Sequence, residues 1–226
     1  MKSISTKELQ ELKDQLNKIK LSSYKWKLLD DCTVRLRLPN NEFMMCPEIG
    51  LRRYQIEIAN KILREGYKKI FWYAPRRGGK EVLSIIFLII CALIDPGQYY
   101  AVYPDNKMAR RILWRGDITM PDRSMKKYLD LFPDLFVVKK REDDMFFRFS
   151  NGSLIQIIGS HVDADSLRGV NLKGVFLSEY AFSETYALEV LTPSIANNKG
   201  FIIIQYTPNG YNHAELAFEK FSADPE

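Results

Sequence analysis

Residues 69–81 read KIFWYAPRRGGKE, and this stretch decides the fold. Its first half is rich in aromatic and β-branched residues, which predicts a buried strand. A polar, Gly-rich loop follows at once, and residues 82–94 are then apolar apart from Ser84. Because that run is too long for one strand and apolar on all sides, we expect a helix buried in the core. A strand, a Gly-rich loop and a helix in this order form the context that a phosphate-binding loop requires.

The loop itself is close to the pattern G-x-x-x-x-G-K-[ST]. Backbone N–H groups and the helix N-terminus would surround the phosphates of a nucleotide, and Lys80 would reach the β and γ oxygens. Ala74 stands where the pattern has its first Gly, and Glu81 replaces the hydroxyl residue that ligates Mg²⁺. A basic Gly-rich turn without a ligand is the alternative. The loop residues expected to bind the nucleotide are Pro75, Arg76, Arg77, Gly78, Gly79, Lys80 and Glu81.

A second apolar strand, residues 175–177, ends in the polar pair Ser178-Glu179. In enzymes with a phosphate-binding loop, an Asp at the first of these positions holds the Mg²⁺ shell, and the following Glu activates water. Here Ser178 replaces the Asp. We hypothesise that Glu81 and Ser178 have exchanged roles as metal ligands, so that one carboxylate and one hydroxyl still serve one Mg²⁺. The alternatives are a helix-capping or Arg-pairing role for Glu81 and a plain strand end at Ser178-Glu179.

The rest of the chain alternates strands and helices. Residues 144–160 contain Asn151-Gly152 between two apolar runs, which predicts an antiparallel hairpin because Asn-Gly tolerates the positive φ angles of a tight turn. Parallel strands joined by helices imply a three-layer α/β sheet, with the hairpin as an insertion or edge. We expect further strands at 99–103, 174–177 and 201–206, and helices around 54–63, 106–114 and 184–195.

The N-terminal part is expected to be a helical appendage, residues 1–50. Ser5 to Glu8 has the spacing of a capping box and precedes leucines at helical period. Residues 22–50 are less periodic and predict a connector with one short strand at 33–38. The expected division is therefore an appendage over 1–50, the nucleotide-binding domain over 51–211 and a C-terminal linker over 212–226.

Composition narrows the functional classes. The 226 residues include 33 Lys+Arg against 28 Asp+Glu, a net charge of +5 that permits a polyanionic partner without requiring one. Three cysteines without a C-x-x-C pair argue against a disulfide framework or a structural zinc site. The longest apolar run is shorter than the roughly 20 residues of a membrane span. We expect a cytosolic protein without membrane contact.

Several motifs in order resemble the ATPase domain of the large terminase subunit of tailed bacteriophages, over roughly residues 50–215. They are Tyr54-Gln55 upstream of the loop, Arg76-Arg77-Gly78-Gly79-Lys80 within it, Ser166-Leu167-Arg168-Gly169, the segment from Val175 to Ala181, and Tyr206-Thr207-Pro208-Asn209-Gly210 after the last strand. The resemblance implies a P-loop NTPase fold of the ASCE type.

The resemblance also implies roles for individual residues. Tyr54 and Gln55 would recognise adenine, although an exposed Gln at a helix start is the alternative. Arg76 or Arg77 would neutralise the γ-phosphate within the same subunit, the other serving as an ion-pair partner. The remaining implied roles are Glu179 as the base that activates water, Arg168 as a finger for the neighbouring subunit's ATP (or a structural Arg before a Gly turn), and Thr207 as the sensor of the γ-phosphate.

For the whole protein, the resemblance implies an Mg²⁺-dependent ATPase that drives double-stranded DNA into a procapsid. Implied partners are DNA through sequence-independent phosphate contacts, further copies in a ring on the portal, and the small terminase subunit. It would act in the cytoplasm of the infected bacterium and not remain in the mature virion. No carboxylate-based nuclease site fits into residues 211–226, so we expect the motor part of a longer protein.

Two other functions fit the residues. One is a helicase-like nucleic-acid ATPase, which would need a second motor domain. The other is a degenerate P-loop subunit that binds nucleotide or DNA without hydrolysis, because Ala74, Glu81 and Ser178 all depart from the pattern. No basic cluster is singled out for DNA, since most such runs are solvated faces. The clusters are Arg52-Arg53, Lys68-Lys69, Arg110-Arg111, Lys126-Lys127 and Lys139-Lys140-Arg141.

Overall fold

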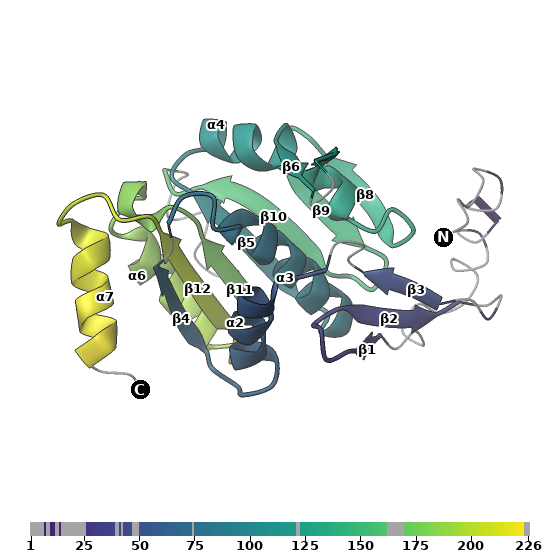
Figure 1. The fold of residues 1–226 in the computed structure, drawn as a ribbon, viewed down its shortest axis with the longest axis horizontal. Coiled ribbons are helices and arrows are strands. Elements are labelled where there is room, and N and C mark those ends of the chain that lie inside the picture. The colour runs from purple at the N-terminus through teal and green to yellow at the C-terminus, as the bar shows by residue number, and fades with distance from the viewer. Residues whose placement is uncertain are drawn as a thin grey trace.

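The computed structural model describes residues 26–38, 41, 43–46, 50–73, 75–120, 123–161 and 170–223, together with residues 7, 10, 11 and 14. Its centre is a seven-stranded sheet in the order β4-β12-β11-β5-β10-β9-β8 (Figure 1). The strands are β4 (Lys69–Tyr73), β5 (Gln98–Tyr103), β8 (Val137–Arg141), β9 (Phe146–Phe149), β10 (Leu154–Gly159), β11 (Leu172–Leu177) and β12 (Phe201–Tyr206).

The sheet is parallel from β4 to β10 and antiparallel beyond it, which confirms the expected mainly parallel α/β fold. The hairpin is an edge feature and not a separate insertion. Its second strand, β10, pairs in parallel with β5, and its first strand, β9, carries β8 at the sheet edge. One hairpin thus ends the parallel part of the sheet and starts the antiparallel part.

Helices lie on both faces of the sheet (Figure 1). The α4 helix runs directly into a π-helical turn, so the basic helix expected around 106–114 is one continuous but irregular segment. The helical elements are α2 (Arg53–Leu63), α3 (Lys80–Ile94), α4 (Asn106–Ala109), η2 (Arg110–Trp114), η3 (Tyr128–Leu131), η4 (Tyr180–Phe182), α6 (Ala187–Ala196) and α7 (His213–Ala223).

Strand β5 shows how the sheet separates two cores. Tyr99, Ala101 and Tyr103 belong to the core around α3, whereas Tyr100 and Val102 belong to the core around α6 and α7. This alternation follows from the two-residue period of side chains along a strand. Both faces of the strand are buried, and its sequence is accordingly apolar without interruption.

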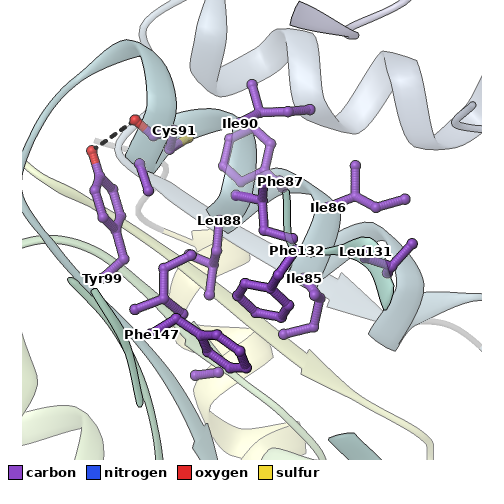
Figure 2. Packing of buried hydrophobic residues seen from close by; sticks show 14 of the residues in the cluster. Ile85, Ile86, Phe87, Leu88, Ile90, Cys91, Tyr99, Leu131, Phe132 and Phe147 are labelled. Atoms are coloured by element: carbon purple, nitrogen blue, oxygen red, sulfur yellow. Dashed lines mark hydrogen bonds between the residues drawn. The ribbon is translucent and has the colours of Figure 1, made fainter. Parts of the chain in front are cut away.

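Helix α3 is buried on all sides (Figure 2). Each residue from Ile85 to Ile90 is fully inaccessible to solvent. Phe87 contacts Phe201 of β12 at a ring-centroid distance of 5.2 Å. The Tyr99 hydroxyl donates to the Asp95 carbonyl at 2.6 Å and lies 3.3 Å from the Cys91 carbonyl, at the C-terminal end of the helix. Burial of each such side chain contributes about 1.5–3 kcal/mol. This helix therefore fixes the position of the Gly-rich loop that precedes it.

The N-terminal connector differs from expectation. Three strands, β1 (Lys27–Leu28), β2 (Val34–Arg37) and β3 (Phe43–Cys46), form a small antiparallel sheet instead of a single short strand. Val34, Leu36 and Cys46 are buried in the same core as α3, which explains why these short segments pair. Of the helix expected over residues 5–19, only residues 7, 10, 11 and 14 are described, and these are helical.

The C-terminal segment also differs from expectation. The sequence predicts a linker over residues 212–226, but His213–Ala223 form helix α7. Phe71 of β4 contacts Phe218 and Phe221 of α7 at ring-centroid distances of 5.7 and 5.3 Å, so α7 packs on the sheet. In the described part of the chain, no helix has both the length and the apolarity that a bilayer crossing demands.

Candidate nucleotide site

The predicted site residues converge where the carboxyl ends of β4, β11 and β12 meet the N-terminus of α3. Because β12 lies between β4 and β11, the residue that follows β12 stands between the Gly-rich loop and the end of β11. A cavity of about 760 Å³ opens here. Its lining comes from four parts of the chain: residues 76–82 of the loop and α3, residues Asp117, Ile118, Thr119 and Tyr128 of the segment that follows η2, Glu179 and Phe182 after β11, and the single residues Arg52 and Met108.

Lys80 is buried at the first position of α3 and connects three strand ends. Its Nζ donates to Thr207 Oγ1 at 2.6 Å and lies 3.8 Å from Glu179 Oε1. A weaker contact of 3.4 Å joins Nζ to the Pro75 carbonyl at the start of the loop. The predicted base, lysine and sensor thus form one cluster, although they lie far apart in the sequence.

Glu179 has an unusual backbone conformation. Its φ and ψ angles are both 48°, in the left-handed region that residues other than Gly rarely adopt. Thr207 donates to its carboxylate at 3.3 Å. The side chain is one of those that line the cavity, because the turn after β11 directs it there. Strained backbone of this kind is concentrated at functional sites.

Glu81 occupies the position next to Lys80 and accepts three hydrogen bonds. Ser178 Oγ donates to Oε1 at 2.5 Å and Gln205 Nε2 donates to the same oxygen at 3.0 Å. The Tyr103 hydroxyl donates to Oε2. The predicted proximity of Glu81 and Ser178 is therefore present in the structure, but two residues that the sequence analysis did not select complete the network.

Burial raises the pKa of Glu81, and the hydrogen bonds from Ser178 and Tyr103 partly offset this effect. The buried hydroxyl of Tyr103 faces the carboxylate, so burial together with the charge of Glu81 raises the pKa of Tyr103 as well. Tyr103 is accordingly a donor to Glu81, because it keeps its proton. A desolvated carboxylate of this kind is stable only while its donors are in place.

The two residues predicted to hold Mg²⁺ differ in access. Ser178 is fully buried and does not line the cavity, whereas Glu81 does. With three of its roughly four acceptor positions engaged, Glu81 retains one for a cation or its water shell. No group of three His, Cys, Asp or Glu side chains converges on a metal position among the described residues. The donor set fits Mg²⁺, which is commonly bound through one or two carboxylates together with phosphates and waters.

Tyr54 and Gln55 brace the loop from helix α2. The Tyr54 hydroxyl donates to the Gly78 carbonyl at 2.5 Å, and Gln55 Nε2 donates to the Gly79 carbonyl at 2.9 Å. The other end of the Gln55 amide accepts from the Arg52 N–H at 2.8 Å. Gln55 is buried and not exposed, so both of its amide ends serve backbone groups in this conformation.

Gly79 has a positive φ of 72°, which favours glycine at this position. A Cβ atom here would lie 2.9 Å from Gln55 Nε2, so the contact of Gln55 with the loop also requires glycine at position 79. No described side chain caps the first turn of α3. Its N–H groups therefore remain directed at the cavity, as in a phosphate-binding helix N-terminus.

Two of the three predicted site arginines lie at the cavity, and the third is outside the described residues. Arg76 and Arg77 are exposed, line the cavity and form no hydrogen bond or ion pair within the described part of the chain. Arg77 has a positive φ of 63°. Arg168, together with the segment Ser166 to Gly169, lies outside the described residues, as does Ala74.

Sequence reasoning missed Tyr103, Gln205 and the segment from Asp117 to Tyr128. Tyr103 and Gln205 are the last and the penultimate residues of their strands, and each is buried on the α3 side of the sheet. A polar residue within the otherwise apolar run FIIIQY was the available signal for Gln205. The segment from Asp117 to Tyr128 had no such sequence signal, because β6 (Asp117–Thr119) and β7 (Met125–Lys127) are too short to be recognised from their residue pattern.

Solved structures share this arrangement of elements. The large terminase ATPase domain of Thermus phage P74-26 superposes with a TM-score of 0.52 over 71% of this chain and 68% of that domain, at 20% identity. The chain has the fold of large-terminase ATPase domains. An arginine-to-alanine variant of the same domain gives 0.54 over 74% and 69% of the two chains at 18% identity.

The large terminase of another thermophilic bacteriophage gives a TM-score of 0.58 over 76% of this chain, at 14% identity. Only 43% of that terminase chain is covered. No family profile and no curated protein sequence matches the chain. The terminase ATPase fold expected from short motifs is thus confirmed by the structure at low sequence identity.

Proposed function

We propose that this chain is an ATP-hydrolysing motor domain of the large-terminase class. The observation that carries the proposal is the cluster of Lys80, Glu179 and Thr207 beside the Gly-rich loop. Lys80 and Glu179 of this cluster line the cavity. A lysine, an acidic residue and a hydroxyl at the carboxyl ends of three parallel strands are suited to bind a phosphate, orient a water and register the loss of the γ-phosphate.

Each residue would act through its own position. The uncapped N–H groups of the first turn of α3 and the Lys80 ammonium would bind the β- and γ-phosphates. Glu179 would orient and deprotonate the attacking water. Arg76 and Arg77, which line the cavity, would neutralise charge that develops on the phosphoryl oxygens.

Glu81 is the residue proposed to hold Mg²⁺ directly or through water, and Ser178 would act through Glu81 as a donor. The hypothesis that both residues ligate Mg²⁺ is thus changed for Ser178, because its hydroxyl donates to the Glu81 carboxylate and does not line the cavity. When bound, Mg²⁺ would neutralise the β- and γ-phosphate oxygens.

The whole-protein function follows from the resemblance and the fold. The motor would move double-stranded DNA into a procapsid, as a ring of copies at the portal and with the small terminase subunit. It would work in the cytoplasm of the infected bacterium and would not be a stable part of the mature virion. Arg168 is proposed to complete a neighbouring subunit's site.

Steady-state ATP hydrolysis with Mg²⁺ tests the proposal across a wide range of protein concentration. Lys80→Ala and Glu179→Gln are each expected to reduce turnover by at least about 100-fold, since removal of one transition-state contact costs roughly 2.7–4 kcal/mol. Lys220→Ala, an exposed lysine on α7, is the matched control and should retain turnover. Nucleotide binding by Glu179→Gln should persist.

Two results would contradict the proposal in different ways. Nucleotide binding without any turnover, even at high concentration, would favour the degenerate P-loop subunit. Turnover that is the same in Glu179→Gln would remove the proposed base.

The same measurement tests whether two subunits share a site. Turnover that rises with protein concentration and is lost in Arg168→Ala would support the shared site, whereas turnover that does not depend on concentration or on this change would exclude it.

A further inference from the structure

A second hollow, of about 460 Å³, lies between η2, β7 and β8, and none of its lining residues is a predicted site residue. Arg115, Lys127 and Lys140 contribute three cations to its lining. All three are exposed, and none forms an ion pair within the described part of the chain. We call this feature the basic hollow.

Nearby acidic groups do not neutralise the basic hollow. Glu142 lines it but lies 3.6 Å from Arg110, which is outside the lining. Asp130 accepts the Lys127 backbone N–H at 3.0 Å and so belongs to the turn after β7. The cations of the hollow remain in excess, which suits an anionic ligand.

Lys140 is held in place by aromatic rings. Its Nζ lies 5.3 Å from the Trp114 ring centroid and 5.8 Å from that of Phe147, within the range of a cation–π contact. Lys139, the preceding residue on β8, contacts Phe146 on the opposite face of the strand. One strand therefore presents two adjacent lysines to different surfaces, and only one of them lines the hollow.

The same short segment lines both cavities. Arg115 and Lys127 face the basic hollow, whereas Asp117, Thr119 and Tyr128, their neighbours in sequence, line the nucleotide cavity. The segment is a β6–β7 hairpin that continues into η3. A ligand that fixes one side of this hairpin would restrict the other side.

We propose that the basic hollow binds the phosphodiester backbone of duplex DNA, and that the β6–β7 hairpin couples this binding to the nucleotide site. The inference rests on the proposed function: the choice of DNA as ligand rests on the motor role, and the coupling rests on ATP hydrolysis. Lysine and arginine contacts to phosphate carry no sequence information, as a translocating motor requires. DNA would therefore contact the chain at the basic hollow, next to the nucleotide cavity.

Fluorescence anisotropy with a short labelled duplex tests the binding half over a range of salt concentrations. Lys127→Ala/Lys140→Ala is expected to weaken binding and to reduce the slope of log K against log salt by about 2, since each phosphate contact contributes roughly 0.9. The matched control is Lys68→Ala/Lys139→Ala, which removes the same charge from two exposed lysines outside the hollow. Equal losses in the two double variants would overturn the proposal.

ATP turnover with and without saturating duplex tests the coupling half. The duplex is expected to stimulate turnover in the unaltered chain and in the control, and the stimulation should be lost in Lys127→Ala/Lys140→Ala. Stimulation that survives in this variant while binding is lost would overturn the coupling. If the chain hydrolyses no ATP at all, the proposed function fails and the coupling with it, but the anisotropy result still decides the binding surface. Thermal unfolding midpoints that match the unaltered chain verify that each variant is folded.

Discussion

At the scale of single residues, the site is organised around one buried carboxylate. Glu81 replaces the expected hydroxyl residue, and its charge is accommodated by three donors: Tyr103 on β5, Gln205 on β12 and Ser178 directly after β11. Ser84 extends the same network, since its hydroxyl lies 3.5 Å from Gln205 Oε1. A buried charge without such donors would be strongly destabilising.

Loss of the Tyr103 donor should therefore be measurable as a loss of stability. Tyr103→Phe is expected to lower the free energy of unfolding at neutral pH by about 1.5–3 kcal/mol, the range for a hydrogen bond to a charged group. Urea unfolding followed by circular dichroism measures the change. Tyr100→Phe is the matched control, because Tyr100 lies on the same strand but in the core on the other face of the sheet. A loss of the same size in both variants would contradict the donor role.

At the scale of elements, the antiparallel edge of the sheet supports the β6–β7 hairpin. Phe147 of β9 stacks on Phe132 at a ring-centroid distance of 3.7 Å and lies 5.2 Å from Trp114 of η2. These rings pack in the core beneath the segment that lines both cavities (Figure 2 shows Phe132 and Phe147). The edge strands thus position functional surface in addition to completing the sheet.

Phe147→Ala should lower the free energy of unfolding by about 3–5 kcal/mol, because it removes a fully buried ring and leaves a cavity. Phe146→Ala, at the adjacent and only partly buried position, should cost clearly less. Guanidinium unfolding of both variants provides the comparison. Similar costs at the two positions would indicate that the β9 face is assigned incorrectly.

At the scale of the whole molecule, the two cores hold tyrosines whose pKa is raised by burial, among them Tyr99, Tyr100 and Tyr180. Above the ordinary pKa near 10, the unfolded chain releases these phenol protons while the folded chain keeps them. The folded state then binds more protons than the unfolded state, so the free energy of unfolding must fall as pH rises.

Urea unfolding between pH 9 and pH 11 should therefore show stability falling above about pH 10. Tyr100→Phe removes one of these groups and should make the fall less steep, although it has little effect at neutral pH. Phenolate absorbance should appear together with unfolding for the buried rings. An identical pH dependence for Tyr100→Phe and the unaltered chain would show that Tyr100 does not contribute.

Local pattern was sufficient for most of the architecture and for part of the site. The strand, Gly-rich loop and apolar helix over residues 69–94, the parallel strands and the Asn151-Gly152 hairpin all formed as predicted, because side-chain period and turn chemistry act over a few residues. Lys80 and Glu179 were selected from the loop and strand-end patterns and Thr207 from the family resemblance. The structure brings these three side chains together, and their roles stay predictions.

Tertiary structure alone decided which residues meet. Gln205 reaches Glu81 across 124 positions of sequence only because β12 lies between β4 and β11, and strand order is set by non-local packing. The short strands β1, β3 and β6 form for the same reason, as they bury apolar residues against elements distant in sequence, and β7 pairs with β6. The sequence by itself determined the Gly-rich loop and its helix. The buried carboxylate network and the hairpin shared by two cavities were decided by the assembled sheet.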